Sequence, residues 1–393
     1  SLFGALRAPA ELRLSPMIYL FWLASAFIAY TLGGYATLLW LISWIRTRRH
    51  QRGEIFPSVT VIVIVHNGAA SIIPKIENTL ASDYPPEKLE VIVGSDGSTD
   101  ATSEVVSAFP DRRVKIVESA QWVGKHHVQQ LARDVAQGEI LVFTDVSVHA
   151  DPQALRKMVS HFADPSVGAV CSVDQMLDRK SGRMGESFYV YGEMGLRGLE
   201  AKVSSLVSLS GSLFAVRRSL CDEWHHDQSS DFFLALHMVQ RGLRAVLDPE
   251  AVAQVGVVRS ERAELTRKVR TILHGLVVFF AHLGLLNPFR YGLFSWQLAS
   301  HKLFRWLLPF AVIAVLFSNC FLWNEGWFYR ATLVLQIAGY AAGAAAHVFK
   351  RAGRIGLFRL AGFFVMGNVA TLVAWWKLCR GEKLVTWEPS RRG

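Results

Sequence analysis

Three acidic residues stand where a predicted strand ends or a predicted helix begins. Asp96 closes the apolar run LEVIVGSD, Asp145 closes EILVFTD, and Asp231 opens the amphipathic stretch DFFLALHMVQRGLRAV. The carboxyl ends of parallel strands are where α/β proteins place ligand chemistry, and a helix N-terminus favours negative charge. Each acid alone has an ordinary structural explanation, as a turn residue, a strand-end acid or a first-turn acid. Together they predict one site that holds several carboxylates.

Such a set of carboxylates suits the transfer of a sugar from a nucleotide sugar. That reaction needs polar contacts for the base and the ribose. It also needs a divalent cation that neutralises the diphosphate leaving group, and a carboxylate base that takes the proton from the acceptor hydroxyl. Three separated carboxylates on one α/β domain could supply these roles.

The elements that position the acids form a predicted α/β domain over residues 46–261. Near-continuous β-branched runs predict strands that alternate with helical patterns such as SIIPKIENTLAS and GKHHVQQLARDVAQ. Strands that alternate with helices indicate a parallel sheet covered on both faces. The predicted strands are residues 59–65, 89–96, 113–117 and 139–145.

Composition and an N-terminal apolar segment indicate a membrane protein. The chain has 393 residues with 51% hydrophobic residues, a net charge of +10 and a mean hydropathy of +0.25. After an N-terminal segment 1–16, residues 17–45 are long enough to span a bilayer and too long for a signal-peptide core. The basic run RTRRHQR follows and predicts a cytoplasmic domain. Basic residues gather beside apolar segments, which favours contact with anionic lipid over nucleic acid.

The chain becomes apolar again after the predicted domain. Residues 262–292 predict interfacial helices, 293–379 predict transmembrane helices, and 380–393 form a tail. About four spans are expected in total. Basic runs flank the last span on both sides, so one apolar segment is expected to be interfacial or re-entrant. Four scattered cysteines without a CxxC pair fit a reducing cytosolic face. The candidate spans after residue 293 are 296–317, 327–348 and 355–376.

Several motifs together resemble a known family. VIVIVHNGAASI, VGSDGSTDAT, GKHHVQQL with GEILVFTDVS, LSGSLFAVRRSL and SSDFFLALHMVQRGLRAVLDPEAVA follow one another in this order from about residue 57 to 270. In order and spacing they resemble the membrane-integrated family-2 glycosyltransferases with a GT-A fold, the group of cellulose, hyaluronan and poly-N-acetylglucosamine synthases. The resemblance implies a Rossmann-like nucleotide-sugar-binding domain embedded between transmembrane helices.

The resemblance also implies a role for individual residues. Asp231 would be the catalytic base, and Asp145 with Ser147 would hold Mg²⁺ or Mn²⁺. Acceptor-side contacts would come from Ser210, Gly211 and Ser212. The nucleotide sugar, expected to be a UDP-sugar, would be bound by Asn67, Asp96, Lys125, Arg267 and Arg270.

Three positions depart from the family pattern. Asn67-Gly68 stands where the family often has Asn-Glu, and Asp145-Val146-Ser147 lacks the second acid of the metal motif. Because Mg²⁺ keeps several waters and needs few carboxylates beside substrate phosphates, we expect a metal site with few protein ligands. His149 is an alternative Mn²⁺ ligand, although a surface histidine explains it as well. Thr271 replaces the Trp of the (Q/R)xxRW motif, which removes a stacking platform for a growing polymer.

The expected function is therefore an inverting hexosyltransferase in extracellular polysaccharide synthesis. Its substrates would be a nucleotide sugar and a glycan acceptor presented by membrane lipid, at a bacterial inner membrane. Transfer of one sugar to a lipid or lipid-linked acceptor is the alternative, and a non-catalytic scaffold is a minor one. An oligomer or a secretion partner is also compatible with the sequence. A nicotinamide-binding domain is disfavoured because no GxGxxG follows a strand.

Overall fold

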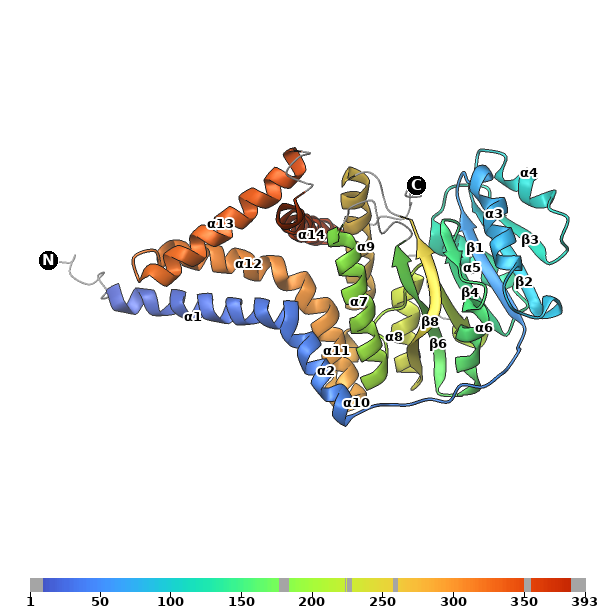
Figure 1. Cartoon of the computed structure of the whole chain (residues 1–393), viewed down its shortest axis with the longest axis horizontal. Coiled ribbons are helices and arrows are strands. Elements are labelled where there is room, and N and C mark those ends of the chain that lie inside the picture. Colours follow the sequence, from blue (N-terminus) through green and yellow to red (C-terminus); the bar gives the residue numbers. More distant parts are fainter. Residues whose placement is uncertain are drawn as a thin grey trace.

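The computed structural model describes residues 10–176, 184–222, 224, 228–256, 261–349 and 355–382. An α/β domain forms one side of the molecule, and long apolar helices extend from the other side (Figure 1). Helices α7 (Met184–Val203) and α9 (Glu261–Ala281) stand between the two parts.

The first half of the sheet is parallel, as predicted. Its four strands run in the order β3-β2-β1-β4, so their carboxyl ends share one edge. Both faces of β1 are buried: Val61 and Val63 pack with Ile72 and Ile76 on one side, and Ile62 packs in a second cluster on the other. Burial on both faces explains the continuous apolar run. The strands are β1 (Val59–Val65), β2 (Leu89–Asp96), β3 (Val114–Ser119) and β4 (Ile140–Asp145).

Beyond β4 the sheet is mixed, so the expectation of a wholly parallel sheet is wrong there. Strand β7 (Leu213–Arg217) runs antiparallel between β4 and β6 (Val167–Met176), and β5 (Val148–Ala150) runs antiparallel to β8 (Arg244–Val255). Strands and helices still alternate after β4, since a helix precedes each of β6, β7 and β8. Strands β6 and β8 pair in parallel, and β7 is antiparallel to both of its neighbours, β4 and β6. The shorter helices of the domain are α3 (Ala69–Leu80), α4 (Thr102–Ser107), α5 (Lys125–Val135), α6 (Ala154–Ser160) and α8 (Ser230–Gln240).

Four helices in the described residues are long and apolar enough to cross a membrane. They are Pro16–Ile45, Leu293–Phe321, Trp327–Val348 and Gly356–Cys379. They agree with the predicted number and positions of the spans. The basic residues 350–354 and the tail from residue 383 lie outside the described residues, so the expected interfacial or re-entrant segment stays a prediction.

Two of these helices bend at a π-helical turn. Helix α1 (Ala10–Ala29) passes through the π-turn Tyr30–Gly34 into α2 (Tyr35–Ile45). In the second, α11 (Leu293–Leu298) passes through Ala299–Leu303, named η6, into α12 (Phe304–Phe321). Both pairs change direction there, so α2 and α11 run toward α7 while α1 and α12 extend away from it (Figure 1). A π-turn interrupts the regular ladder and is a known cause of such kinks.

The two bends touch each other through polar groups. The Tyr30 hydroxyl lies 2.7 Å from the Ser300 hydroxyl and accepts a 2.8 Å hydrogen bond from the Trp296 indole. The ring of Trp296 also packs edge-on against Tyr35, with 5.1 Å between centroids. These contacts give the two bent helices a defined relative position.

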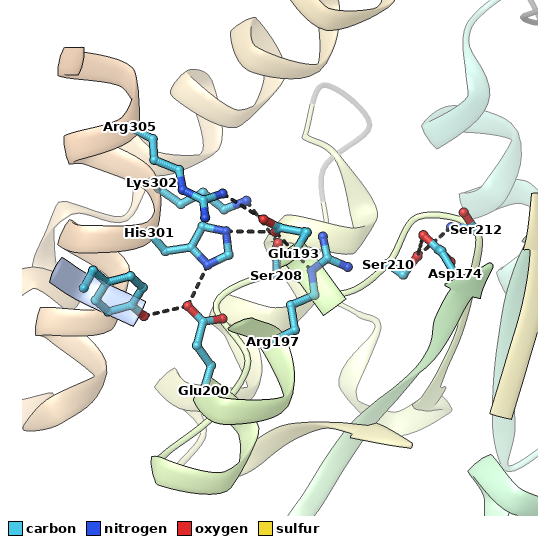
Figure 2. Close-up of polar contacts among 11 residues, drawn as sticks. Asp174, Glu193, Arg197, Glu200, Ser208, Ser210, Ser212, His301, Lys302 and Arg305 are labelled. Atoms are coloured by element: carbon cyan, nitrogen blue, oxygen red, sulfur yellow. Dashed lines mark hydrogen bonds and ion pairs between the residues drawn. The ribbon is translucent and has the colours of Figure 1, made fainter. Parts of the chain in front are cut away.

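A buried histidine joins the second bend to α7. His301 Nδ1 lies 2.6 Å from Glu200 Oε1, and Nε2 lies 3.0 Å from Glu193 Oε1 (Figure 2). Both glutamates belong to α7. Each ring nitrogen faces a carboxylate oxygen of a different glutamate, so the imidazole of His301 bridges Glu193 and Glu200. Tyr35 donates a 2.7 Å hydrogen bond to the same Glu200 oxygen.

Two arginines complete the surroundings of Glu193. Arg305 NH1 lies 2.8 Å from Glu193 Oε2, and Arg197 Nε lies 3.3 Å from Glu193 Oε1. Burial alone would raise the pKa of Glu193. The charges of Arg305, His301 and Arg197 outweigh burial and hold that pKa well below its ordinary value. Glu193 therefore remains ionised and keeps the membrane helices attached to α7.

Replacing His301 by Leu should destabilise the junction strongly. The change leaves Glu193 and Glu200 buried without the imidazole that both of them contact, and each buried oxygen that loses its partner costs about 1–3 kcal/mol. Ser300→Ala is the matched control, because it removes one neutral hydrogen bond worth about 1 kcal/mol. Thermal unfolding of the purified variants would measure this difference. The melting temperature of the His301→Leu variant should lie well below that of Ser300→Ala. Equal melting temperatures would contradict this role.

Candidate active site

The turn after β1 supports the turn after β2. Asn67 has a φ of 50°, and its side-chain oxygen accepts a 2.7 Å hydrogen bond from the Thr99 N–H. Its own N–H donates to the Ser98 hydroxyl at 3.1 Å. Asn67 is exposed at this edge of the sheet. The structure shows it holding a turn, and its predicted contact with the nucleotide stays a prediction.

Asp96 is fully buried and organises the start of α5. Its carboxylate accepts the N–H groups of Val123 at 2.9 Å and Gly124 at 3.1 Å. Gly97 has a φ of 60°, and a Cβ there would lie 2.5 Å from the Trp122 nitrogen, so the Asp-Gly pair allows the two turns to meet. The predicted contact between Asp96 and the nucleobase stays a prediction.

An aromatic pair that the motifs did not predict lies at the same edge. The rings of His66 and Trp122 stack with 4.6 Å between centroids and 11° between planes. His66 Nδ1 is 2.6 Å from the Asp96 carbonyl oxygen, which places the pair beside the turn after β2. Trp122 is 36% exposed, and a partly exposed aromatic face can stack on a nucleobase. In the sequence, this aromatic site could have been recognised from the single tryptophan in the segment SAQWVGK.

Lys125 and Asp145, which were both predicted to belong to the site, contact each other. Lys125 begins α5, Asp145 ends β4, and their Nζ and Oδ1 atoms lie 2.5 Å apart. The two side chains are 18% and 24% exposed, so the pair remains accessible. A cation and a carboxylate side by side can meet a diphosphate and its counter-ion at the same place.

Lys75 is a second cation near Asp145, and the motif analysis missed it. It is buried and donates to the Val148 carbonyl at 2.7 Å and to the Thr144 hydroxyl at 3.2 Å. Desolvation lowers its pKa to about 8, although the charge of Asp145 opposes that shift. Lys75 thereby fixes the turn that carries Ser147. In the sequence, Lys75 could have been recognised as a lysine on the otherwise apolar face of the helical segment 69–80.

The oxygen donors at this turn suit a hard divalent cation. Asp145 and Ser147 lie on the turn between β4 and β5, and carboxylate and hydroxyl oxygens are ligands that Mg²⁺ or Mn²⁺ accepts. No group of three or more His, Cys, Asp or Glu residues in the described ranges could hold a metal. His149 is exposed and lies 3.2 Å from Asn78 Nδ2, as expected of a surface histidine. Phosphate oxygens would have to complete the ion's ligands.

Asp231 lies in the first turn of α8 and faces the loop 208–212. Its carbonyl oxygen accepts the Leu209 N–H at 3.1 Å. A Cβ on Gly211 would lie 3.5 Å from Asp231 Oδ2. The structure therefore brings the predicted base and the predicted acceptor-side segment together. Ser229 is the N-cap residue of α8 but makes no side-chain capping hydrogen bond.

Two of the acceptor-side residues contact each other and a further acid. The Ser210 hydroxyl donates a 2.6 Å hydrogen bond to Asp174 Oδ2, and the Ser212 N–H lies 3.4 Å from the Ser210 oxygen (Figure 2). These bonds shape the loop so that its glycine can approach Asp231.

The two arginines of α9 differ in their surroundings. Arg267 donates two hydrogen bonds, of 2.8 and 2.7 Å, to Glu264. The pKa of half-buried His126 lies well below its ordinary value because of desolvation and of nearby positive charges, those of Lys125 and Arg270 among them. Arg270 thus lies near the start of α5, as expected of a residue on the nucleotide side. Contact of either arginine with the diphosphate stays a prediction.

The sequence of this chain is similar to a family model and to several known proteins. Residues 60–224 match the model of glycosyl transferase family 2. The succinoglycan biosynthesis protein ExoO of Rhizobium meliloti is 33% identical over 33% of this chain, which spans 37% of that protein. An N-acetylglucosaminyltransferase of Bradyrhizobium elkanii is 33% identical over 30% of this chain and 67% of its own length. The O-antigen chain rhamnosyltransferase RfbN of Salmonella typhimurium is 26% identical over 53% of this chain and 69% of its own length.

A solved structure resembles nearly the whole molecule. The mannosyltransferase PcManGT of Pyrobaculum calidifontis, in complex with GDP-Man and Mn²⁺, superposes with a TM-score of 0.71 at 25% identity. The match covers 92% of this chain and 99% of that one. Together with the mixed sheet and the apolar helices, these similarities establish that the chain belongs to glycosyl transferase family 2 and carries a GT-A domain.

Proposed function

We propose that this protein is an inverting, metal-dependent glycosyltransferase that moves a sugar from a nucleotide sugar to an acceptor held at the membrane, in extracellular polysaccharide synthesis. The observation that carries the proposal is the position of Asp231. Its carboxylate faces the loop 208–212 on the side of the membrane helices, while the Lys125–Asp145 pair occupies the strand edge. The names of the succinoglycan and O-antigen relatives support the polysaccharide context.

Each residue would act through its own chemistry. The nucleobase would stack on the ring pair of His66 and Trp122. Lys125 would donate hydrogen bonds to the diphosphate. An ion held by Asp145 and Ser147 would neutralise the leaving group. Asp231 would take the proton from the acceptor hydroxyl as that oxygen attacks the anomeric carbon from the face opposite the diphosphate. A single displacement of this kind inverts the anomeric configuration.

The donor and the location of the domain are further parts of the proposal. We propose that the donor is a UDP-sugar, as the resemblance implies. GDP-sugars should be tested beside it, because the similar mannosyltransferase binds GDP-Man. We also propose that the domain is cytoplasmic at a bacterial inner membrane. The basic run RTRRHQR that follows the first span and the buried free thiols of Cys171 and Cys221 support this orientation.

Addition of a single sugar to a lipid-linked acceptor is the second candidate. Thr271 is exposed on α9 at the position where the resemblance expects a Trp, so no aromatic ring at this position can support a sliding polymer. Separation of labelled products by chain length would distinguish the candidates. A single organic-soluble, one-sugar product would support the lipid-linked acceptor, and a ladder or high-mass polymer would support processive synthesis. A lack of metal-dependent nucleotide-sugar binding would favour a scaffold.

Asp231→Asn should abolish transfer while leaving nucleotide binding nearly intact. Loss of a general base lowers kcat by about 10²–10⁴-fold, and the Asn side chain keeps the shape of the site. The measurement is initial transfer rate together with the Kd of the nucleotide. Asp134→Asn, which changes an exposed acid on α5, is the matched control and should keep full activity. Equal loss of transfer and of nucleotide binding would exclude Asp231 as the base.

Mn²⁺ should bind well only when a nucleoside diphosphate is present. Two lysines near Asp145 add positive charge that opposes a divalent cation, whereas a diphosphate supplies both charge and oxygen ligands. Electron paramagnetic resonance can count free Mn²⁺ with and without UDP or GDP. We expect at least about tenfold tighter binding with the nucleotide, and loss of that gain in Asp145→Asn. Equally tight binding without nucleotide would contradict this view of the site.

A further inference from the structure

Lys302 connects a membrane helix to both parts of the Asp231 site. It lies in η6, next to His301. Its Nζ donates a 3.0 Å hydrogen bond to the Ser208 hydroxyl, at the start of the acceptor-side loop (Figure 2). The same atom lies 5.0 Å from the ring centroid of Phe232, the residue after Asp231. A cation from the membrane side therefore stands beside the predicted base.

The other cations of this junction are paired with carboxylates, and Lys302 is not. Arg305, Arg197 and His301 all contact Glu193. Within the described part of the chain, no carboxylate oxygen lies within 4.0 Å of Lys302 Nζ, and one of its three N–H donors has a protein acceptor. Because Lys302 is only partly buried, the remaining donors can meet a ligand. Among the nearby charges, those of Glu193 and Asp231 attract Lys302, and those of Arg197 and Arg305 repel it.

Arg197 supplies a second unused donor in the same junction. Its NH1 is buried and has no hydrogen-bond partner among the described residues. The positive charges of Arg197 and Lys302 repel each other, and the carboxylate of Glu193 attracts both of them. Glu193 hydrogen-bonds Arg197 only through Nε, which leaves NH1 unused. A buried donor without an acceptor costs free energy, and an anion that accepts from NH1 would remove that cost.

We propose that Lys302, Arg197 and Ser208 bind the phosphate group of a lipid-linked acceptor. The inference rests on the proposed function and names the class of its acceptor. Lys302 belongs to the apolar helix Leu293–Phe321, the side from which the head group of a lipid would approach. The donor diphosphate has separate partners at Lys125 and the end of β4. A phosphate held at Lys302 would leave the attached acceptor hydroxyl beside Asp231.

Binding of a short lipid phosphate tests this subsite directly. The full chain would be placed in phosphatidylcholine nanodiscs and titrated calorimetrically with geranyl phosphate, geraniol and inorganic phosphate, with empty discs as blanks. We expect geranyl phosphate to bind at least about tenfold more tightly than either other probe. Lys302→Met should weaken that binding about 10- to 100-fold, since it removes a charged hydrogen bond while keeping the stem.

Two control variants separate the subsite from general charge and from folding. Lys302→Arg keeps the charge and should bind within about threefold of wild type. Arg290→Met removes an exposed charge from α10 (Pro288–Tyr291) and should change nothing. Nucleotide binding should survive Lys302→Met, which shows that the variant is folded.

Three results would overturn the subsite. They are equal binding of geranyl phosphate and geraniol, unchanged binding in Lys302→Met, and binding of inorganic phosphate as tight as that of geranyl phosphate, which would assign the site to free phosphate. Failure of sugar transfer with intact, Lys302-dependent binding of geranyl phosphate would instead count against the proposed function alone.

Discussion

The contact of His301 with Glu193 and Glu200 is the interaction on which the arrangement of this protein depends. It joins a bend in a membrane-type helix to α7 through charges that are out of contact with water. Buried charges tolerate little displacement, because separating them leaves each one unsolvated. The bend therefore has one position relative to the catalytic domain. That position sets where Lys302, one residue later, meets the acceptor-side loop.

The three acids that first indicated a site do different physical work. The carboxylate of Asp96 accepts hydrogen bonds from main-chain N–H groups and thereby shapes the start of α5. Asp145 is paired with the lysine that this helix start presents. Asp231 faces Gly211, where the absence of a side chain leaves room beside the carboxylate. The buried acid thus positions a cation next to the second acid, and the third acid lies on the membrane side.

The sequence allowed prediction of features that depend on local pattern. The β-branched run at 59–65 predicts a strand because both faces of β1 are buried, and the acids at strand ends follow from that assignment. Features that depend on distant partners were missed. Lys75 and Trp122 acquire their roles from Val148 and His66, across the fold. A helix precedes β7 just as helices precede the parallel strands, so this alternation gives no sign that β7 pairs antiparallel with β4 and β6.

The anomeric configuration of the product tests the central claim most directly. That claim is a single displacement in which Asp231 activates the acceptor on the face opposite the diphosphate. The full-length protein would be supplied with an α-linked nucleotide sugar and a membrane extract, and the new linkage would be assigned by proton NMR. The account predicts a β-linked product. An α-linked product, or release of free sugar without transfer to any acceptor, would contradict it.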